Sequence, residues 1–353
     1  MNKTIKYGTN LAIAGGVGNG VVNIIKQLNV MTMNPRQKFD WKSLLIAVGK
    51  GGLVGGGIGL FTGAIVDYQN SMEKPIDTDA FLFSFVNAAR LTKQDSSYIS
   101  LDHKAEQLIH LFLTHFQTEL ASDPMKGGSS EKGTALKDHF DIDIYLPFKS
   151  GSFTSTRQMI DEVYSFLQRH QNKHEVIGLR QQGKSVGVFF MISGKELKID
   201  VVPYKITKAK ENKTSGYLHV RKRTVWGERS TYTKTDIQAL NSIKLTKTQK
   251  KILIVLKTWK TKNDLPVSSH LLQNLILDAY AYNTVPRTFT KKIIMVLQHI
   301  ADNLDLIVIR SVENTNNVLT NIPIENKARI VKACKEAIEK YKYQSNSIID
   351  LVS

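Results

Sequence analysis

The sequence has almost no cysteine: Cys334 is the single one among 353 residues. One cysteine cannot form an internal disulfide, and Cys334 lies far from any cluster of cysteine and histidine residues. This excludes a disulfide scaffold, a cysteine-rich zinc site and an iron–sulfur site. A chain without disulfides is typical of the reducing cytoplasm, which we take as the expected location.

Acidic residues are also in short supply, with 31 Asp and Glu against 48 Lys and Arg, so the formal net charge is +17. Such an excess attracts polyanions, which include nucleotides, nucleic acids and acidic membrane surfaces. Because 42% of the residues are hydrophobic, the chain can build about two domains with buried cores. A wholly disordered or fibrous chain is excluded.

Glycine becomes rare after residue 66, since 13 of the 23 glycines lie before that point. Residues 7–25 carry no charge and residues 43–66 carry only Lys50, so both stretches approach the ~20 residues that cross a bilayer. Small residues recur every four positions from Gly51 to Gly63, which favours close helix packing. We predict that residues 1–75 form a glycine-rich hairpin that anchors the protein at the cytoplasmic face of a membrane through residues 1–66. The alternative is a glycine-rich module that packs against itself or other protein.

The rest of the chain has the pattern of an α/β unit over residues 76–240, followed by a helical domain over residues 241–353. Apolar residues at helical spacing predict a long helix within residues 99–121. Alternating residues predict strands at 141–146 and 197–202, with a helix at 157–170 and an apolar run at 186–192 between them. From residue 245 onward, helical periodicity recurs in four segments.

Three aspartates in the two alternating strands are candidates for chemistry. Asp141 and Asp143 are two residues apart and project from one face of their strand, and Asp200 lies on the polar face of the other. If the strands are neighbours, the carboxylates converge and suit two Mg²⁺ ions, or Mn²⁺, that activate a hydroxyl and neutralise pyrophosphate. The alternative is an exposed acidic strand edge.

A glycine-rich turn, Gly127-Gly128-Ser129-Ser130-Glu131-Lys132-Gly133-Thr134, comes directly before the acidic strand. Backbone N–H groups in such a turn can hold phosphate oxygens.

Together, Gly128-Ser129, Asp141-Ile142-Asp143 and Lys198-Ile199-Asp200-Val201-Val202-Pro203 resemble the polymerase-β-type nucleotidyltransferase superfamily. The chain looks most like its bacterial CD-NTases, relatives of cyclic GMP-AMP synthase and oligoadenylate synthase. Three later segments support this placement: Lys257-Thr258-Trp259, Pro266-Val267-Ser268-Ser269-His270-Leu271, and residues 314–318. The resemblance covers roughly residues 76–340 and implies an α/β core with a mixed sheet followed by a helical domain.

The resemblance implies a role for each matching residue. Asp141 and Asp143 would bind both metals, and Asp200 would complete the catalytic metal site and help to deprotonate the attacking ribose hydroxyl. Nucleotide-binding roles fall to Gly128, Ser129, Lys257 and Ser268. Where the family often has an aromatic residue after that serine, this chain has Ser269, so base stacking must come from elsewhere.

The activity that the resemblance implies is magnesium-dependent synthesis of a cyclic or short oligonucleotide messenger from nucleoside triphosphates. Its expected setting is antiphage defence, with a downstream effector that responds to the product. Two alternatives are nucleotidyl transfer to protein or tRNA, as in toxin-like relatives, and an inactive membrane-bound scaffold or effector. The presence of all three aspartates argues against the last.

A basic segment, residues 205–234, contains nine Lys or Arg against two Glu, with Tyr217, Trp226 and Tyr232 interleaved. Basic and aromatic side chains together can bind an acceptor nucleotide or RNA, but a solvated basic surface explains most of these charges better. Trp226 is the candidate for base contact, with core packing as the equal alternative.

Overall fold

The computed structural model describes residues 77–207, 214–224 and 227–353. The described residues form two compact units, one of residues 89–338 and one of residues 77–88 with 339–353. The second unit contains most of helix α5 (Thr78–Ala89) and the short 3-10 helix η2 (Ser345–Leu351). The predicted hairpin over residues 1–75 lies outside the described residues. Within the described part of the chain, no helix combines the length and the apolar character that a membrane span requires.

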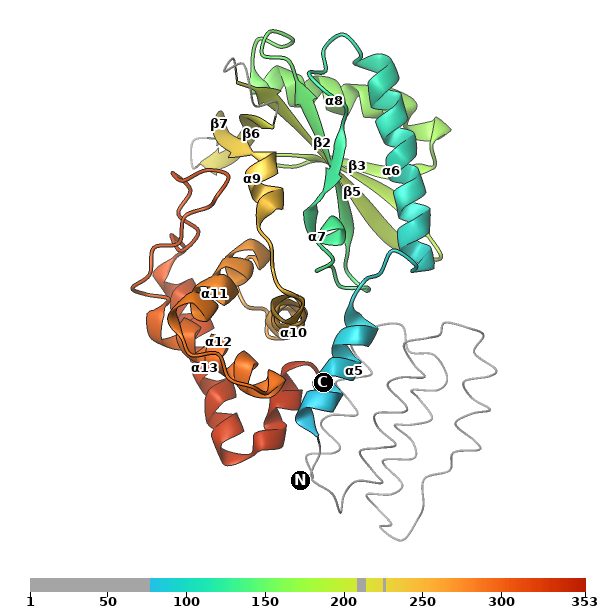
Figure 1. The fold of residues 1–353 in the computed structure, drawn as a ribbon. Helices are drawn as coiled ribbons and strands as arrows, with labels where there is room; N and C mark the ends of the chain where they lie inside the picture. The colour runs from blue at the N-terminus through green and yellow to red at the C-terminus, as the bar shows by residue number, and fades with distance from the viewer. Residues whose placement is uncertain (1–76, 208–213, 225–226) are drawn as a thin grey trace, which may run out of the picture. The chain divides into compact units, whose positions relative to one another are not determined.

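A mixed sheet forms the centre of the larger unit (Figure 1). The strands run in the order β1-β2-β5-β4-β3. Strand β6 pairs antiparallel with the end of β5 and also with β7. Their bounds are β1 Met125–Gly127, β2 Asp141–Phe148, β3 Val176–Gln181, β4 Val186–Ile192, β5 Lys195–Ile206, β6 Ser215–Thr224 and β7 Gly227–Asp236. Only the β2–β5 pair is parallel among the pairs of these strands. The two strands predicted from alternation are therefore direct neighbours.

Two helices, α6 (Ser96–His115) and α8 (Thr156–His170), cover one face of the sheet, as Figure 1 shows. Their apolar sides join one core with the inward residues of the strands, among them Ile142, Ile144, Val188, Ile199 and Val201. Helix α8 begins at an N-cap, Ser155, whose side chain accepts a hydrogen bond from the Gln158 N–H at 3.1 Å. The opposite face carries the polar residues of β2 and β5 that alternate with these, together with a second, smaller buried cluster of Tyr145, Val202, Tyr204, Leu218 and Ile237.

Helices follow the sheet, as the periodicity after residue 245 predicts. They are α9 Ile237–Ser242, α10 Lys247–Lys262, α11 Ser269–Tyr282, α12 Phe289–Asn303 and α13 Ile324–Tyr343. Helix α10 begins with a capping box in which Thr246 and Gln249 exchange hydrogen bonds. Helices α10, α11 and α12 pack on one another around buried residues such as Leu256, Leu275 and Ile293. These helices belong to the same compact unit as the sheet up to residue 338.

Candidate active site

The three predicted aspartates meet on the polar face of the sheet. In the parallel register of β2 and β5, Asp143 pairs with Asp200 and Asp141 pairs with Lys198. Their neighbours Ile142 and Ile199 are fully buried on the helix-covered face, so the alternation of the two strands turns the carboxylates to the other side. We call Asp141, Asp143 and Asp200 the carboxylate cluster.

A lysine ammonium stands between two members of this cluster. Nζ of Lys198 lies 2.7 Å from Oδ2 of Asp200 and 3.4 Å from Oδ2 of Asp141. The other oxygen of Asp200, Oδ1, accepts a hydrogen bond from Nε2 of Gln182 at 3.2 Å. Both oxygens of Asp200 therefore have a partner, and its side chain is held in one orientation.

The electrostatics of the cluster are those of crowded carboxylates. Burial raises the pKa of Asp143 to about 7, and the charges of Asp141 and Asp200 add to this shift. Burial also raises the pKa of Asp200, although the Lys198 ammonium opposes the shift. For Lys198, burial lowers the pKa, but its contacts with Asp200 and Asp141 outweigh it and raise the pKa overall. The site therefore favours the uptake of positive charge.

The glycine loop, residues 127–134, lies directly over the cluster and includes the short helix α7 (Gly128–Glu131). Gly128 has a φ of +78°, and an added Cβ would stand 1.7 Å from Oδ2 of Asp143. A Cβ at Gly127 would stand 2.4 Å from the Tyr145 ring. Both positions need glycine because the backbone itself contacts the side chains of β2.

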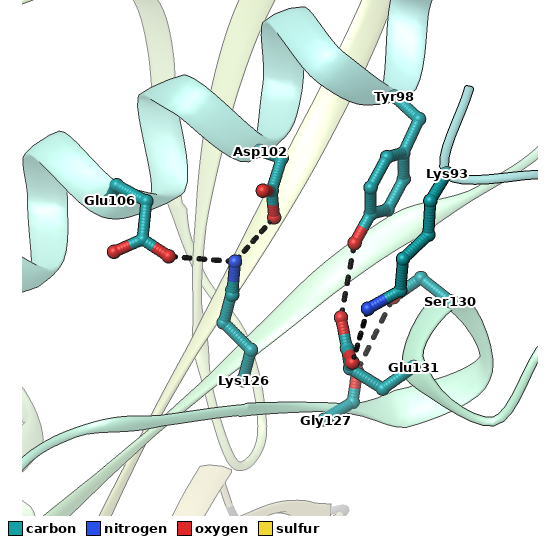
Figure 2. A network of polar contacts seen from close by, with 8 residues as sticks. All are labelled: Lys93, Tyr98, Asp102, Glu106, Lys126, Gly127, Ser130 and Glu131. Atoms are coloured by element: carbon teal, nitrogen blue, oxygen red, sulfur yellow. Dashed lines mark hydrogen bonds and ion pairs between the residues drawn. The ribbon is translucent and has the colours of Figure 1, made fainter. Parts of the chain in front are cut away.

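Helix α6 fixes the glycine loop from the outside, as Figure 2 shows. Lys126 of β1 pairs with Asp102 at 2.6 Å and with Glu106 at 2.7 Å. Glu131 of α7 accepts a hydrogen bond from the Tyr98 hydroxyl at 3.0 Å and pairs with Lys93 at 3.1 Å. These contacts hold both ends of the α7 turn against a long helix, so the loop backbone is positioned before any ligand arrives.

Two lysines, the buried Lys257 and the half-buried Lys132 of the loop itself, link the loop to the helical region. Lys257 of α10 donates from Nζ to the Thr134 carbonyl at 2.7 Å, and Lys132 donates to the Leu240 carbonyl at 2.9 Å. Burial lowers the pKa of Lys257 to about 8, and neighbouring Lys260 adds to the shift. Burial also lowers the pKa of Lys132. Two ammonium groups are thus kept in a poorly solvated place beside the glycine loop.

The remaining predicted residues have mixed placements. The Ser268 hydroxyl is the N-cap of α11 and accepts from the Leu271 N–H at 3.0 Å. Ser129 lies half-buried in α7, and its carbonyl accepts from the Thr134 N–H at 2.9 Å. Asn314, in the segment that resembles the family, donates to the Thr233 hydroxyl of β7 at 3.0 Å. Trp226 lies outside the described residues.

Sequence reasoning missed several polar residues that belong to this face. Gln182 holds Asp200 through a hydrogen bond to Oδ1. Arg180 lies over the Phe189 ring at 5.4 Å, and its charge opposes the rise that burial causes in the pKa of Asp200. The alternation of polar and apolar residues in β3 and β4 shows which residues share a face of the sheet. It does not show which of them lie near Asp200, because that depends on how these strands pair.

The donor set of the cluster suits a hard divalent cation, because carboxylate oxygens are the ligands that Mg²⁺ and Mn²⁺ take. Across residues 77–207, 214–224 and 227–353, however, no group of three or more acidic, histidine or cysteine side chains forms a ready metal cage. The ammonium of Lys198 lies between Asp141 and Asp200, and the three carboxylates supply oxygen ligands of the kind that such a cation takes.

No family model and no curated protein matches the sequence, whereas solved structures match over most of the chain. Escherichia coli MS115-1 CdnC, in its complex with HORMA-deltaN, is 16% identical with a TM-score of 0.57, over 77% of this chain and 93% of that chain. Bradyrhizobium diazoefficiens CD-NTase CdnG, in complex with GTP, is 12% identical with a TM-score of 0.57, over 78% of this chain and 96% of that chain. Vibrio cholerae DncV cyclic AMP-GMP synthase, with the linear intermediate 5′ pppA(3′,5′)pG, is 14% identical with a TM-score of 0.52, over 84% of this chain and 85% of that chain.

At these identities the likeness is one of fold. The chain has a CD-NTase-like nucleotidyltransferase fold, with a mixed sheet of the polymerase-β type followed by a helical region. The fold predicted from the aspartate strands and the glycine-rich turn is confirmed.

Proposed function

We propose that this protein is a divalent-metal-dependent nucleotidyltransferase that joins nucleoside triphosphates into a cyclic or short oligonucleotide and releases pyrophosphate. One observation carries the proposal: three carboxylates from two parallel strands converge beneath a glycine loop. The solved structures with this fold add support, because one is described with GTP and another as a cyclic AMP-GMP synthase.

Each part of the site has a task in this reaction. Asp141, Asp143 and Asp200 would hold Mg²⁺ or Mn²⁺, which would supply neutralising charge for the triphosphate and acidify the attacking hydroxyl. Asp200 would accept the proton of that ribose hydroxyl. Gly128 and Ser129 would hold the triphosphate through the backbone N–H groups of the glycine loop. Positioning and charge neutralisation provide most of the catalysis in such transfers.

The helical region would contribute through Lys257, whose ammonium is beside the loop and close enough to Asp141 for that carboxylate to oppose the lowering of the Lys257 pKa by burial. It would attract the β- and γ-phosphates as a point charge. Ser268 would assist mainly by starting α11 in the right place, since its hydroxyl already caps that helix. We keep Trp226 as the candidate for base contact.

Incubation of the purified protein with the four labelled nucleoside triphosphates and Mg²⁺ or Mn²⁺ tests the proposal. Chromatography should separate a new oligonucleotide product and pyrophosphate. Asp141→Asn and Asp143→Asn should lose the product and keep the fold, because the substitution removes a ligand charge without opening a cavity. Asp305→Asn, at an exposed position, is the matched control. Label transferred to added tRNA or protein, with no free oligonucleotide, would favour the toxin-like activity instead.

We also propose a setting for the reaction, on the family resemblance: antiphage defence, with a separate effector that responds to the product. Expression of the protein with its effector should lower phage yield, and Asp141→Asn should abolish this protection. Residues 1–66 would anchor the enzyme to the membrane, so the full-length protein should sediment with membranes and resist extraction by high salt. A full-length protein that stays soluble without detergent would exclude the anchor.

A further inference from the structure

The cation position between Asp141 and Asp200 already contains the ammonium of Lys198. Its distances to the two carboxylates, 2.7 Å to Asp200 and 3.4 Å to Asp141, are those of ion pairs with both. The contacts follow from the strand pairing: Lys198 is opposite Asp141 on the neighbouring strand and two residues before Asp200 on its own. A side chain at this position can therefore reach both acids at once.

Asp200 cannot turn away from this position. Its Oδ1 is held by Gln182, whose own backbone N–H donates to the Ser185 carbonyl at 2.8 Å. Gly187 makes room for this contact, because a Cβ there would stand 2.9 Å from Nε2 of Gln182 and 3.4 Å from the Lys198 side chain. Oδ2 of Asp200 is consequently aimed at the lysine ammonium, and a divalent cation would need the same oxygen.

The space that a displaced Lys198 side chain would need lies next to the cluster. A pocket of about 360 Å³ lies beside the cluster, and its charged lining consists of Lys198 and Arg180 with Asp138, Asp141 and Glu196. Asp138 already pairs with Lys195 at 3.6 Å, so Glu196 is the counter-ion that this pocket offers to an ammonium that leaves Asp200. The Lys198 side chain is 24% exposed, so water can also solvate the displaced ammonium.

We propose that Lys198 is a resident counter-ion of the catalytic carboxylates, which binds in competition with a divalent cation and moves into the neighbouring pocket when the cation arrives. This inference rests on the metal site of the proposed function. Without metal, the ammonium offsets the repulsion among three crowded carboxylates and keeps them in place. Because the ammonium competes for the site, a higher concentration of free divalent cation is needed to fill it. The site therefore favours a cation that arrives bound to a triphosphate over the free ion.

The direct test is a titration of the full-length protein with Mn²⁺ alone, followed by the electron paramagnetic resonance signal of the free ion. Lys198→Met keeps the length of the side chain and removes the competing charge, so it should bind Mn²⁺ about tenfold more tightly than the unaltered protein. Lys335→Met is the control, because Lys335 is an exposed lysine of α13 that does not line this pocket. It should bind Mn²⁺ as the unaltered protein does.

Thermal unfolding supplies a second readout that does not depend on activity. In EDTA, Lys198→Met should melt at a lower temperature, since the carboxylates lose their counter-ion, and added Mn²⁺ should raise its melting temperature more than that of the unaltered protein. In the unaltered protein, acetylation of Lys198 by acetic anhydride, measured by mass spectrometry, should become faster when Mn²⁺ is added. This last measurement needs no variant to fold.

The outcomes separate the two proposals. Loss of Mn²⁺ binding in Asp141→Asn, with normal binding in the unaltered protein, supports the metal site itself. Unchanged or weaker Mn²⁺ binding in Lys198→Met, or a Lys198 acetylation rate that does not respond to Mn²⁺, would overturn the counter-ion role while leaving the metal site intact. If the unaltered protein binds no Mn²⁺ with or without a triphosphate, both proposals are wrong.

Discussion

The backbone of Gly128 lies against the carboxylate of Asp143, so closely that a Cβ at Gly128 would stand 1.7 Å from Oδ2 of that aspartate. The loop proposed to hold the triphosphate and the aspartate proposed to hold metal therefore share one contact surface. In the proposed reaction, any change that widens this contact would move the phosphates away from the metal.

Gly128→Ala should abolish activity, because the methyl group must displace either the loop or Asp143. The left-handed backbone adds a cost of roughly 1–3 kcal/mol to folding. Gly194→Ala is a close control, since Gly194 has a φ of +75° but nothing within 4 Å of an added Cβ. It should lose stability and keep its activity. Thermal melts with product assays measure both, and equal activity in the two variants would contradict the contact.

Stability in the absence of metal should depend on pH through Asp143. Its pKa is about 7 in the folded protein against an ordinary 3.8, so the folded state holds this proton more tightly than the unfolded state. The resulting stabilisation is present below pH 4 and is lost as the pH rises through 7, at about 1.4 kcal/mol per unit of pKa difference.

Asp143→Asn removes this titration, so in EDTA the variant should gain stability relative to the unaltered protein as the pH rises from 5 to 8. Urea denaturation at each pH gives the two free energies of unfolding. Parallel curves for the two proteins would show that Asp143 has an ordinary pKa.

Lys257→Met should raise the KM for nucleotides about tenfold with a smaller effect on kcat, because the variant loses a charge aimed at the ground-state triphosphate. Its stability should change little, since burial already disfavours the ammonium and brings the pKa of Lys257 down to about 8. Lys247→Met, at the exposed first residue of α10, is the control. Unaltered kinetics in Lys257→Met would show that the role of the lysine is structural, through its hydrogen bond with the Thr134 carbonyl.

Glu131→Ala should loosen the glycine loop, because it removes the hydrogen bond between the loop and the buried Tyr98 hydroxyl and leaves that hydroxyl with Asp102 alone. The expected loss of stability is about 0.5–1.5 kcal/mol. Lys93→Met removes only the partly exposed ion pair, in which the lysine side chain is 62% exposed, and should cost less than ~1 kcal/mol. Hydrogen exchange over residues 127–134 should speed up in the first variant alone.

The face on which each of the three aspartates lies could be predicted from sequence because the strands carry their own signal, whereas their convergence was predicted only if the two strands are neighbours. Ile142 and Ile199 mark the buried face, and a period of two places every carboxylate on the other. The glycine-rich turn before Asp141 was equally visible, since the close approach of Gly128 to Asp143 requires glycine.

What could not be predicted depends on contacts between distant segments. The Lys198 contact with Asp141 needs the register of two strands that are 57 residues apart, and the Gln182 contact needs the β3–β4 pairing as well. Ser268 shows the opposite case, because a serine three residues before Leu271 at a helix start is a standard capping signal. The family resemblance drew attention to its nucleotide role instead.

The three aspartates come together only in the one register in which β2 and β5 pair. A slip of one residue would turn Asp200 and Lys198 into the helix-covered core and expose Ile199 and Val201, at a prohibitive cost in buried charge. A slip of two would preserve the hydrophobic alternation and yet separate Asp200 from Asp143. Molecules trapped in that second register would be compact, well packed and catalytically silent, so a preparation can be fully folded by spectroscopy and still contain a fraction that never turns over.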